Sequence, residues 1–290
     1  MILSQIELSI KRKIEAVGTP LKDWDINIYR GLLTGYNDAF IITTQKRDEI
    51  LSNCQSEDER RRTEELIRPI LRGRDIKRYS YDWANLWLIW VPWHFPLHND
   101  TSIQGASDRA EQAFKEQYPA LYNHLLTFKK ELSARNKAET GIRYEWYALQ
   151  RWGANYWEDF NRPKILFQEI VQESQFMIDT DGTFFCNDTG RIIVGEGLYH
   201  LLGIMNSTLF FYSIKSFYGG GILGDHGIRM KHTFFEKFPC IPIQERISLM
   251  AEHLSQDPEP RIQKELDDLV FRLYGLTKDE VDYIHMVVNQ

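Results

Sequence analysis

The sequence predicts an α+β protein with mixed strands. The 290 residues are 43% hydrophobic and 26% charged, which is typical of a folded globular chain and excludes a disordered or collagen-like one. Short strand-like segments alternate with amphipathic helices, and three helical segments follow one another at the C-terminal end. We therefore expect a linker helix over residues 1–20, a main domain over 21–243 and a small helical module over 244–290.

The N-terminal part is expected to begin with a helix and a hairpin. Apolar residues from Leu3 to Val17 recur at steps of three and four, which predicts a helix over 3–17. The segment WDINIYRG alternates apolar and polar residues and predicts a strand. Residues 39–43 predict a second strand, paired with the first through a turn at Gly35 and Asn37, two residue types that tolerate positive φ.

The other elements follow from the same patterns. Helices are expected over 46–52 and 57–67, with Ser56 as the N-cap of the second, and Pro69 and Gly73 are expected to mark its end. The remaining predicted elements are a strand at 86–91, helices within 108–135 broken near Pro119, strands at 164–170, 175–178, 183–186 and 191–194, an apolar helix at 199–217, and helices near 244–255, 260–273 and 277–287.

The net charge of −6 hides an uneven distribution. Residues 245–290 contain five basic and ten acidic residues, whereas residues 60–78 contain eight basic and three acidic ones. The chain therefore has a basic segment and an acidic tail. The three cysteines form no CxxC pair, and no apolar segment approaches the roughly 20 residues of a membrane helix. We expect a cytoplasmic protein without a membrane contact.

Motifs for catalysis are missing from the sequence. The glycines at 219–221 and 224 are not followed by Lys-Ser/Thr and come after a helix, which excludes a phosphate loop and a dinucleotide fingerprint. His94 and His98 are separated by Pro96, and Asp179 and Asp181 flank a glycine, as turn residues do. We therefore expect no catalytic residue, metal site or cofactor in this chain.

Several segments carry a family resemblance. They are RGLLTGYNDAF at 30–40, IRPILRGRDIKRY at 67–79, PKI at 163–165, LLGIMNS at 201–207 and FEKFP at 235–239. In this order and spacing they resemble the TaqI-like C-terminal specificity domain, the target-recognition part of adenine-specific DNA methyltransferases and of single-chain restriction–modification enzymes. The segment LDDLVFRLYGLTKDE at 266–280 is similar to the C-terminal end of the same enzymes.

The resemblance implies a DNA-methylase specificity fold that binds double-stranded DNA. It also implies a methyltransferase domain, and possibly a nuclease, that would hold S-adenosylmethionine and the flipped adenine, as in type IIG enzymes. The Asn-Pro-Pro-Tyr type of motif for that adenine does not occur in this sequence. The chain is therefore expected to be either an excised fragment or a free-standing recognition piece that works with a separate catalytic partner.

The residues that we expect to contact DNA supply cations, amides or backbone groups that suit phosphates and base edges. They are Arg30, Thr34, Tyr36, Asn37, Arg72, Arg74, Lys77, Arg78, Arg143, Arg151, Lys215, Gly220, Arg229, Lys231 and His232. Arg72 to Arg78 is the densest group, opposed only by Asp75. Arg60–Arg62 and Arg68 can instead pair with nearby glutamates at helical spacing. The aromatic residues of 142–157 can stack on bases or form core.

The predicted function is sequence-specific recognition of double-stranded DNA for a restriction–modification enzyme, without catalysis by this chain. One alternative is a metal-dependent nuclease of another family, which incubation with plasmid and magnesium would reveal. The other is a protein-interaction module without DNA affinity. A DNA-binding assay at several salt concentrations distinguishes this protein-interaction module from a DNA-binding domain, because phosphate contacts release counterions.

Overall fold

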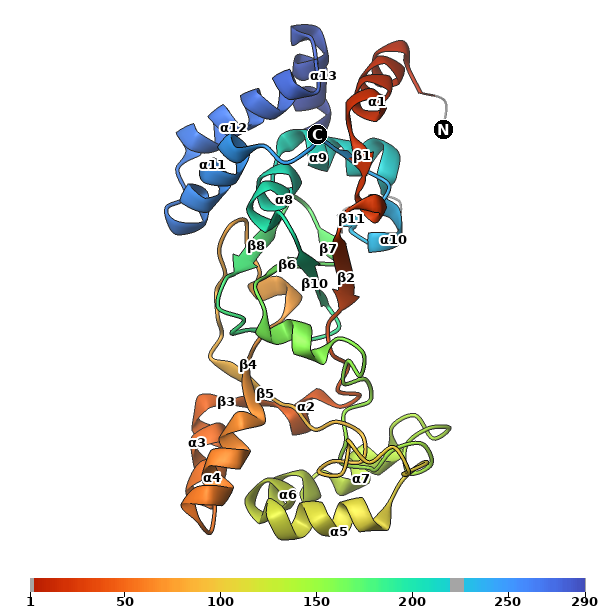
Figure 1. Ribbon diagram of the computed structural model, residues 1–290, viewed down its shortest axis with the longest axis vertical. Helices are drawn as coiled ribbons and strands as arrows, with labels where there is room; N and C mark the ends of the chain where they lie inside the picture. Colours follow the sequence, from red (N-terminus) through yellow and green to blue (C-terminus); the bar gives the residue numbers. More distant parts are fainter. Residues whose placement is uncertain (1–2, 220–226, 290) are drawn as a thin grey trace.

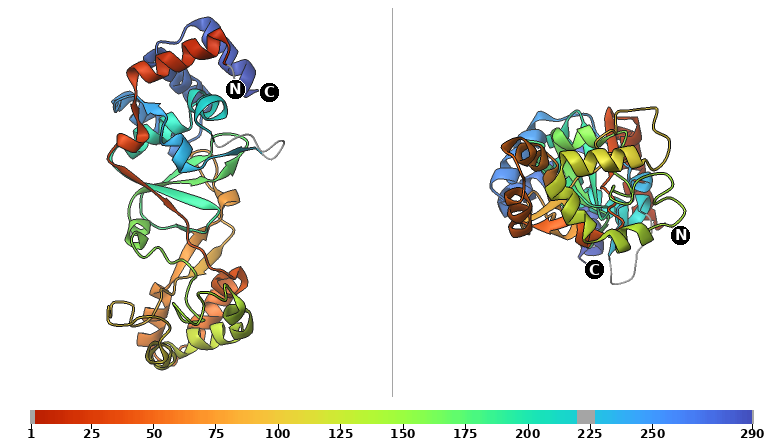
Figure 2. Two further views of the ribbon diagram at one scale, coloured as in Figure 1. Left: turned by 90° about the vertical axis from the view of Figure 1, so that its right-hand side faces the viewer. Right: turned by 90° about the horizontal axis from the view of Figure 1, so that it is seen from below.

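The computed structural model describes residues 3–219 and 227–289 and is an elongated molecule. Both chain ends lie in an upper lobe, which contains the long helices at the N-terminal and C-terminal ends (Figure 1). A lower lobe contains helices and a small sheet, mostly from the first half of the chain, and a second sheet lies between the lobes (Figures 1 and 2). Among the described residues, no helix has both the length and the apolar character needed to cross a membrane.

The central sheet joins the two lobes. Its antiparallel strands lie in the order β2 (Ile26–Arg30), β10 (Gly190–Gly195), β6 (Lys164–Gln168) and β8 (Phe176–Asp179). Successive side chains of a strand point to opposite faces. Leu166 and Ile192 therefore pack into the core of the lower lobe, whereas Ile165 and Ile193 pack into the core of the upper lobe. Burial on both faces explains why these strands are so apolar.

The lower lobe is built around a second sheet with the strand order β3 (Ile41–Thr43), β5 (Leu86–Ile89), β4 (Ile67–Leu71) and β9 (Phe185–Cys186). Its helices are α2 (Asn37–Phe40), α3 (Thr44–Ser52), α4 (Glu57–Glu65), α5 (Asp108–Gln117), α6 (Pro119–Leu126) and α7 (Lys129–Ala134). The predicted cap of α4 is confirmed, since the Ser56 side chain accepts a hydrogen bond from the Glu59 amide. The predicted break of the helical segment near Pro119 is also confirmed, because α5 ends at Gln117 and α6 begins at Pro119.

Two local predictions in this lobe are wrong. The expected hairpin does not form, because residues 37–40 wind into the short helix α2 and β3 pairs with β5 in the other sheet. The helix predicted to reach Ile67 ends at Glu65, and Pro69 lies within strand β4. Proline is tolerated there because β9 pairs only with Ile70 and Leu71, so the missing Pro69 amide is not needed for that ladder.

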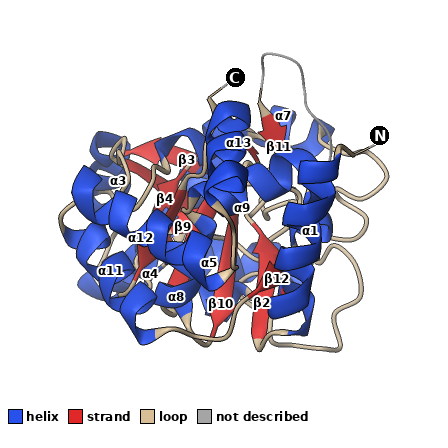
Figure 3. Cartoon of the chain, turned by 90° about the horizontal axis from the view of Figure 1, so that it is seen from above, coloured by secondary structure: helices blue, strands red, loops and turns tan. Residues whose placement is uncertain are grey.

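The upper lobe consists mostly of helices (Figure 3). Its elements are α1 (Gln5–Val17), β1 (Thr19–Pro20), β7 (Ile170–Val171), α8 (Leu198–Met205), α9 (Thr208–Ser213), the π-helical turn η4 (Ile214–Tyr218), β11 (Ile228–Arg229), α10 (His232–Phe235), β12 (Pro239–Cys240), α11 (Glu245–Gln256), α12 (Pro260–Leu273) and α13 (Lys278–Val288). The helix predicted over 199–217 is interrupted between α8 and α9. The Ser207 side chain caps α9, and the side-chain amide of Asn206 donates to the Phe176 carbonyl.

The acidic tail is part of the upper core. Leu266 and Ile284 of the tail helices are buried in the same cluster as Ile10 and Ile14 of α1. Glu280 at the start of α13 joins the two ends of the chain, because its carboxylate accepts hydrogen bonds from Ser9 Oγ and Lys13 Nζ, both at 2.7 Å. The domain boundaries at residues 20 and 243 stay predictions.

Replacement of Glu280 by glutamine should loosen this junction. Burial alone would raise the pKa of Glu280, but hydrogen bonds from Lys13, Ser9 and the Thr277 amide outweigh it and lower the pKa to about 2. Because the folded value lies below the ordinary value of 4.5, the stabilisation is complete above about pH 4.5 and is lost as the pH falls toward 2. We expect Glu280→Gln to lower the free energy of unfolding at pH 7 by about 1–3 kcal/mol, as measured by urea unfolding. The difference between variant and parent should shrink steadily below pH 4.5, and a difference that is independent of pH would contradict this assignment.

Candidate nucleic-acid interface

Basic residues from distant segments meet at one end of the central sheet. Strands β2 and β6 end there and β10 and β8 begin there, since Arg30 lies opposite Arg191 and Gln168 opposite Gly190. We call this region the sheet end. Two predicted basic segments reach it: the Gly73 amide donates to Thr189 Oγ1 at 2.9 Å, and Arg229 pairs with Ile170 just beyond β6.

Arg191 lies at the centre of the sheet end. Its side chain is only 3% exposed, and its Nη2 donates to Glu169 Oε2 at 2.6 Å. Arg229 reaches the same carboxylate, with Nε 4.0 Å from Oε1. The Nε and Nη1 groups of Arg191 are buried and have no hydrogen-bond partner among the described residues. One carboxylate thus holds two guanidinium groups, and part of the buried positive charge remains unmatched.

His232 extends this group at the start of α10. Its pKa is lowered chiefly by burial, and the nearby charges of Arg191, Arg30 and Lys231 lower it further. The ring is therefore neutral at pH 7. Among the charges that act on this ring, only Glu236 opposes the three cations. The structure thus brings Arg30, Arg191 and the segment from Arg229 to His232 together at the sheet end from three separate segments. A surface of this kind attracts phosphates.

The basic group at 72–78 is mostly engaged by the protein itself. Arg72 binds Asp75 through two parallel hydrogen bonds of 2.9 and 2.7 Å. Lys77 Nζ donates to the Arg74 carbonyl at 2.8 Å, and Arg78 donates to the Asn206 carbonyl at the end of α8. Arg74 is exposed, and its side chain forms no ion pair with any described residue. Of this predicted group, Arg74 is thus the cation best placed to meet a ligand.

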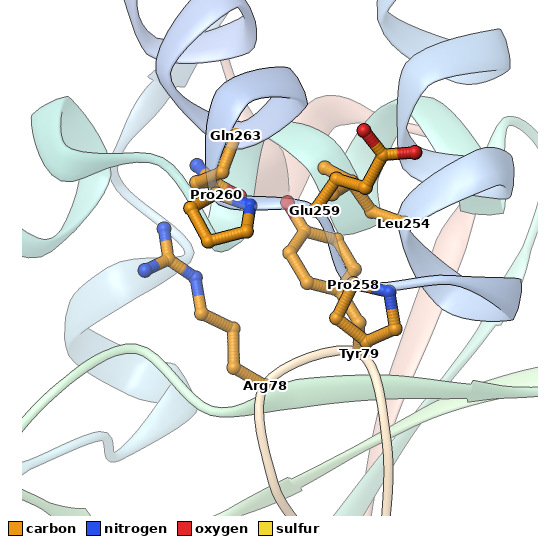
Figure 4. A pocket seen from close by; sticks show the side chains of 7 residues that line it. All are labelled: Arg78, Tyr79, Leu254, Pro258, Glu259, Pro260 and Gln263. Carbon is orange, nitrogen blue, oxygen red and sulfur yellow. The ribbon is translucent and has the colours of Figure 1, made fainter.

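Arg78 also lines a hollow of about 300 Å³ between its loop and the tail helices. Arg78 and Tyr79 lie on one side of it, and Pro258, Pro260 and Gln263 lie on the other (Figure 4). The Tyr79 hydroxyl and Gln263 Oε1 are buried without hydrogen bonds in the described structure. The position of Arg78 between these elements points to a role in joining the loop to the helices.

The turn residues at 34–37 differ in accessibility. Thr34 is 2% exposed and its hydroxyl donates to Asn37 Oδ1, while its carbonyl accepts from the buried Arg135. A base edge cannot reach the Thr34 side chain in this arrangement. Asn37 is exposed, and Tyr36 is half-buried with its ring against Phe128.

The remaining predicted contacts are scattered. Arg143 pairs with Glu139 at 3.0 Å and covers the Trp93 ring. Lys215 donates to the Val287 carbonyl at 2.8 Å, so it binds the end of α13 rather than facing a ligand. Arg151 is exposed near β2, and Gly220 lies outside the described residues.

The alternative prediction for Arg60–Arg62 and Arg68 is partly confirmed. Arg61 and Arg62 pair with Asp58 at helical spacing, although glutamates were the expected partners. Arg68 instead donates to Asn161 and lies over the Phe185 ring. Trp146, which the sequence left open between core and base stacking, is 7% exposed and belongs to the lower core.

Sequence reasoning missed Arg191 and Glu169. Arg191 opens an apolar strand, where a single cation gives no periodic signal, and Glu169 follows directly after β6.

The described residues also place His253, Asp257 and Glu259 close enough to share a metal ion. His253 Nε2 lies 3.1 Å from Glu259 Oε1, and the group is largely exposed, so a hydrogen bond at the surface accounts for it.

A comparison with protein-family models identifies the fold. The model of the TaqI-like C-terminal specificity domain matches residues 68–240, which is more than half of the chain. The chain belongs to this family. The match to the specificity domain includes β4, β6, β10 and β11, and it therefore covers most of the sheet end, but it leaves out β2 and the tail helices. No curated protein sequence matches significantly.

One solved structure shares the fold of this chain at low identity, and a second matches with a lower score. The type IIL restriction–modification enzyme MmeI, determined in complex with DNA, is 14% identical with a TM-score of 0.56 over 93% of this chain. The type IIG restriction endonuclease BpuSI is 13% identical over 93% of the chain, with a TM-score of 0.47. The matched regions are 36% of MmeI and 33% of BpuSI, so the specificity domain spans about a third of either protein.

Proposed function

We propose that this chain recognises a specific sequence in double-stranded DNA and that the sheet end contacts the phosphates. The observation that carries the proposal is that Arg30 lies opposite the buried Arg191 in the central sheet and that Arg229, two residues before Lys231, shares the Glu169 partner of Arg191. These cations occur in a member of a specificity-domain family. Specificity requires contacts with base edges in addition to phosphates. The exposed Asn37 beyond β2 and His232 beside the cations are suited to such contacts.

The catalytic steps belong, in this proposal, to a methyltransferase domain or subunit that holds S-adenosylmethionine, with or without a nuclease. The chain matches 36% of the restriction–modification enzyme MmeI, which supports a larger assembly of this kind. The chain itself would supply target choice. We place this assembly in the cytoplasm, where it would meet DNA.

Selection from a random pool of duplexes tests the proposal. At about 0.1 M salt we expect the chain to enrich one sequence, and the logarithm of its affinity should fall linearly with the logarithm of the salt concentration. If Arg30, Arg229 and Lys231 each neutralise one phosphate, the slope should be about −2.7 or steeper. Binding without any sequence preference, or with a slope near zero, would contradict target recognition.

A further inference from the structure

An aromatic hollow of about 300 Å³ opens beside the sheet end. Its lining comes from the turn after β5, with Trp93 and His94, and from residues 151–156, with Arg151, Trp152, Asn155 and Tyr156. The lining is mostly apolar, and its polar groups stand among three aromatic rings. This composition suits a flat, aromatic ligand whose edge carries polar atoms.

His94 of the hollow is held in place by a buried carboxylate. The His94 amide donates to Glu145 Oε2 at 2.7 Å, and the ring nitrogen Nδ1 lies 3.0 Å from Oε1 of the same buried carboxylate. The backbone of His94 has φ +61°, a strained conformation that these hydrogen bonds secure. The other ring nitrogen, Nε2, has no partner among the described residues, and the same is true of the exposed Asn155 side chain.

The hollow borders the proposed phosphate contacts. Arg151 and Leu33 exchange two backbone hydrogen bonds of 2.9 and 3.0 Å just beyond Arg30. Tyr156 stacks on Tyr29, with ring centroids 4.5 Å apart. Burial raises the pKa of Tyr156, and the charges of Arg151, Arg30 and Arg191 oppose this shift. A DNA strand at Arg30 would therefore pass the mouth of the hollow.

We propose that this hollow receives one nucleobase that leaves the helical stack of DNA bound at the sheet end, an inference that rests on the proposed function. The base would stack against Trp152 and Tyr156, since Trp93 is already covered by Arg143 and Tyr144. Its edge would face His94 and Asn155. The exposed, unpaired Arg151 would hold a phosphate next to that base. The hollow is a separate site from the phosphate contacts, because none of Arg229, Lys231 and His232 lines it.

A duplex with a single bulged 2-aminopurine tests the inference. An unpaired base needs no energy for unpairing, so its transfer into an aromatic site adds its full stacking energy to the affinity. We expect the full chain to bind the bulged duplex about tenfold tighter than the fully paired one, with a change in 2-aminopurine fluorescence. Trp152→Ala should remove this gain and leave the affinity for the paired duplex unchanged.

Two further variants complete the test. Trp152→Phe keeps a stacking ring and should retain most of the gain, whereas Trp24→Leu changes a half-buried tryptophan of the upper lobe and should behave like the parent. Equal affinities of the parent for bulged and paired duplexes would overturn the hollow as a base site and leave the proposed function intact. So would a Trp152→Ala variant that keeps the gain or weakens both duplexes alike. Failure to bind either duplex would overturn both proposals.

Discussion

Replacing Arg30, Arg229 and Lys231 together by glutamine should weaken DNA binding roughly 500-fold at about 0.1 M salt. The figure follows from three lost phosphate contacts, each of which contributes about 0.9 to the salt slope relative to 1 M salt. Because phosphates carry no sequence information, the loss should be similar for the selected duplex and for an unrelated one. Titrations of both duplexes at several salt concentrations measure the affinity and the slope, which should become shallower by about 2.7.

A matched triple variant controls for the change in net charge. Arg12 of α1, Lys115 of α5 and Lys264 of α12 are exposed and form no ion pair in the described structure. Their joint replacement by glutamine removes the same charge at a distance from the sheet end. This control should retain nearly the affinity of the parent. Equal losses in the two variants would show that net charge, rather than the sheet end, governs binding.

Lys164→Met should lower the free energy of unfolding by about 3–5 kcal/mol. The Lys164 ammonium is fully buried at the start of β6 and donates to Asp179 Oδ2 at 2.6 Å and to the Phe160 carbonyl at 2.7 Å. Burial lowers the pKa of this ammonium, and the Asp179 carboxylate opposes that shift. Without Lys164, Asp179 would remain as an unpaired buried charge. Urea unfolding monitored by tryptophan fluorescence measures the loss.

The double variant Lys164→Met/Asp179→Asn identifies the cause of that loss. Asp179 also accepts hydrogen bonds from the amides of Thr183 and Phe184, and an asparagine oxygen can still accept them. The double variant should therefore recover part of the stability lost in Lys164→Met. If it is no more stable than the single variant, lost packing rather than an unpaired charge explains the effect.

Local signals in the sequence predicted much of the fold. Capping residues such as Ser56 marked helix starts, and the apolar steps in the tail predicted all three of its helices. Strand pairing could not be predicted in this way. Strand β2 pairs with β10 far along the chain, and the expected hairpin partner lies in the other sheet. Such pairing depends on contacts between distant residues and leaves no local pattern.

The candidate interface was predictable only in its parts. The run from Arg229 to His232 stood out as basic, but its proximity to Arg30 and Arg191 depends on the order of strands in the central sheet. The denser basic group at 72–78 was predicted to be free for DNA, but most of its cations bind other groups of the protein. Its Arg72 and Asp75 are three residues apart, and the ion pair that they form removes both from the surface charge. Composition locates cations along a chain, but their partners decide which of them remain free.

Photo-crosslinking to DNA tests the central claim most directly. The duplex enriched by selection, with 4-thiothymidine in place of thymidine, would be bound to the full chain and irradiated, and the crosslinked peptides would be identified by mass spectrometry. We expect crosslinks in peptides that contain residues 26–37 or 227–234, which form the sheet end and its borders. Crosslinks confined to the acidic helices α11 to α13, with none at the sheet end, would contradict the account.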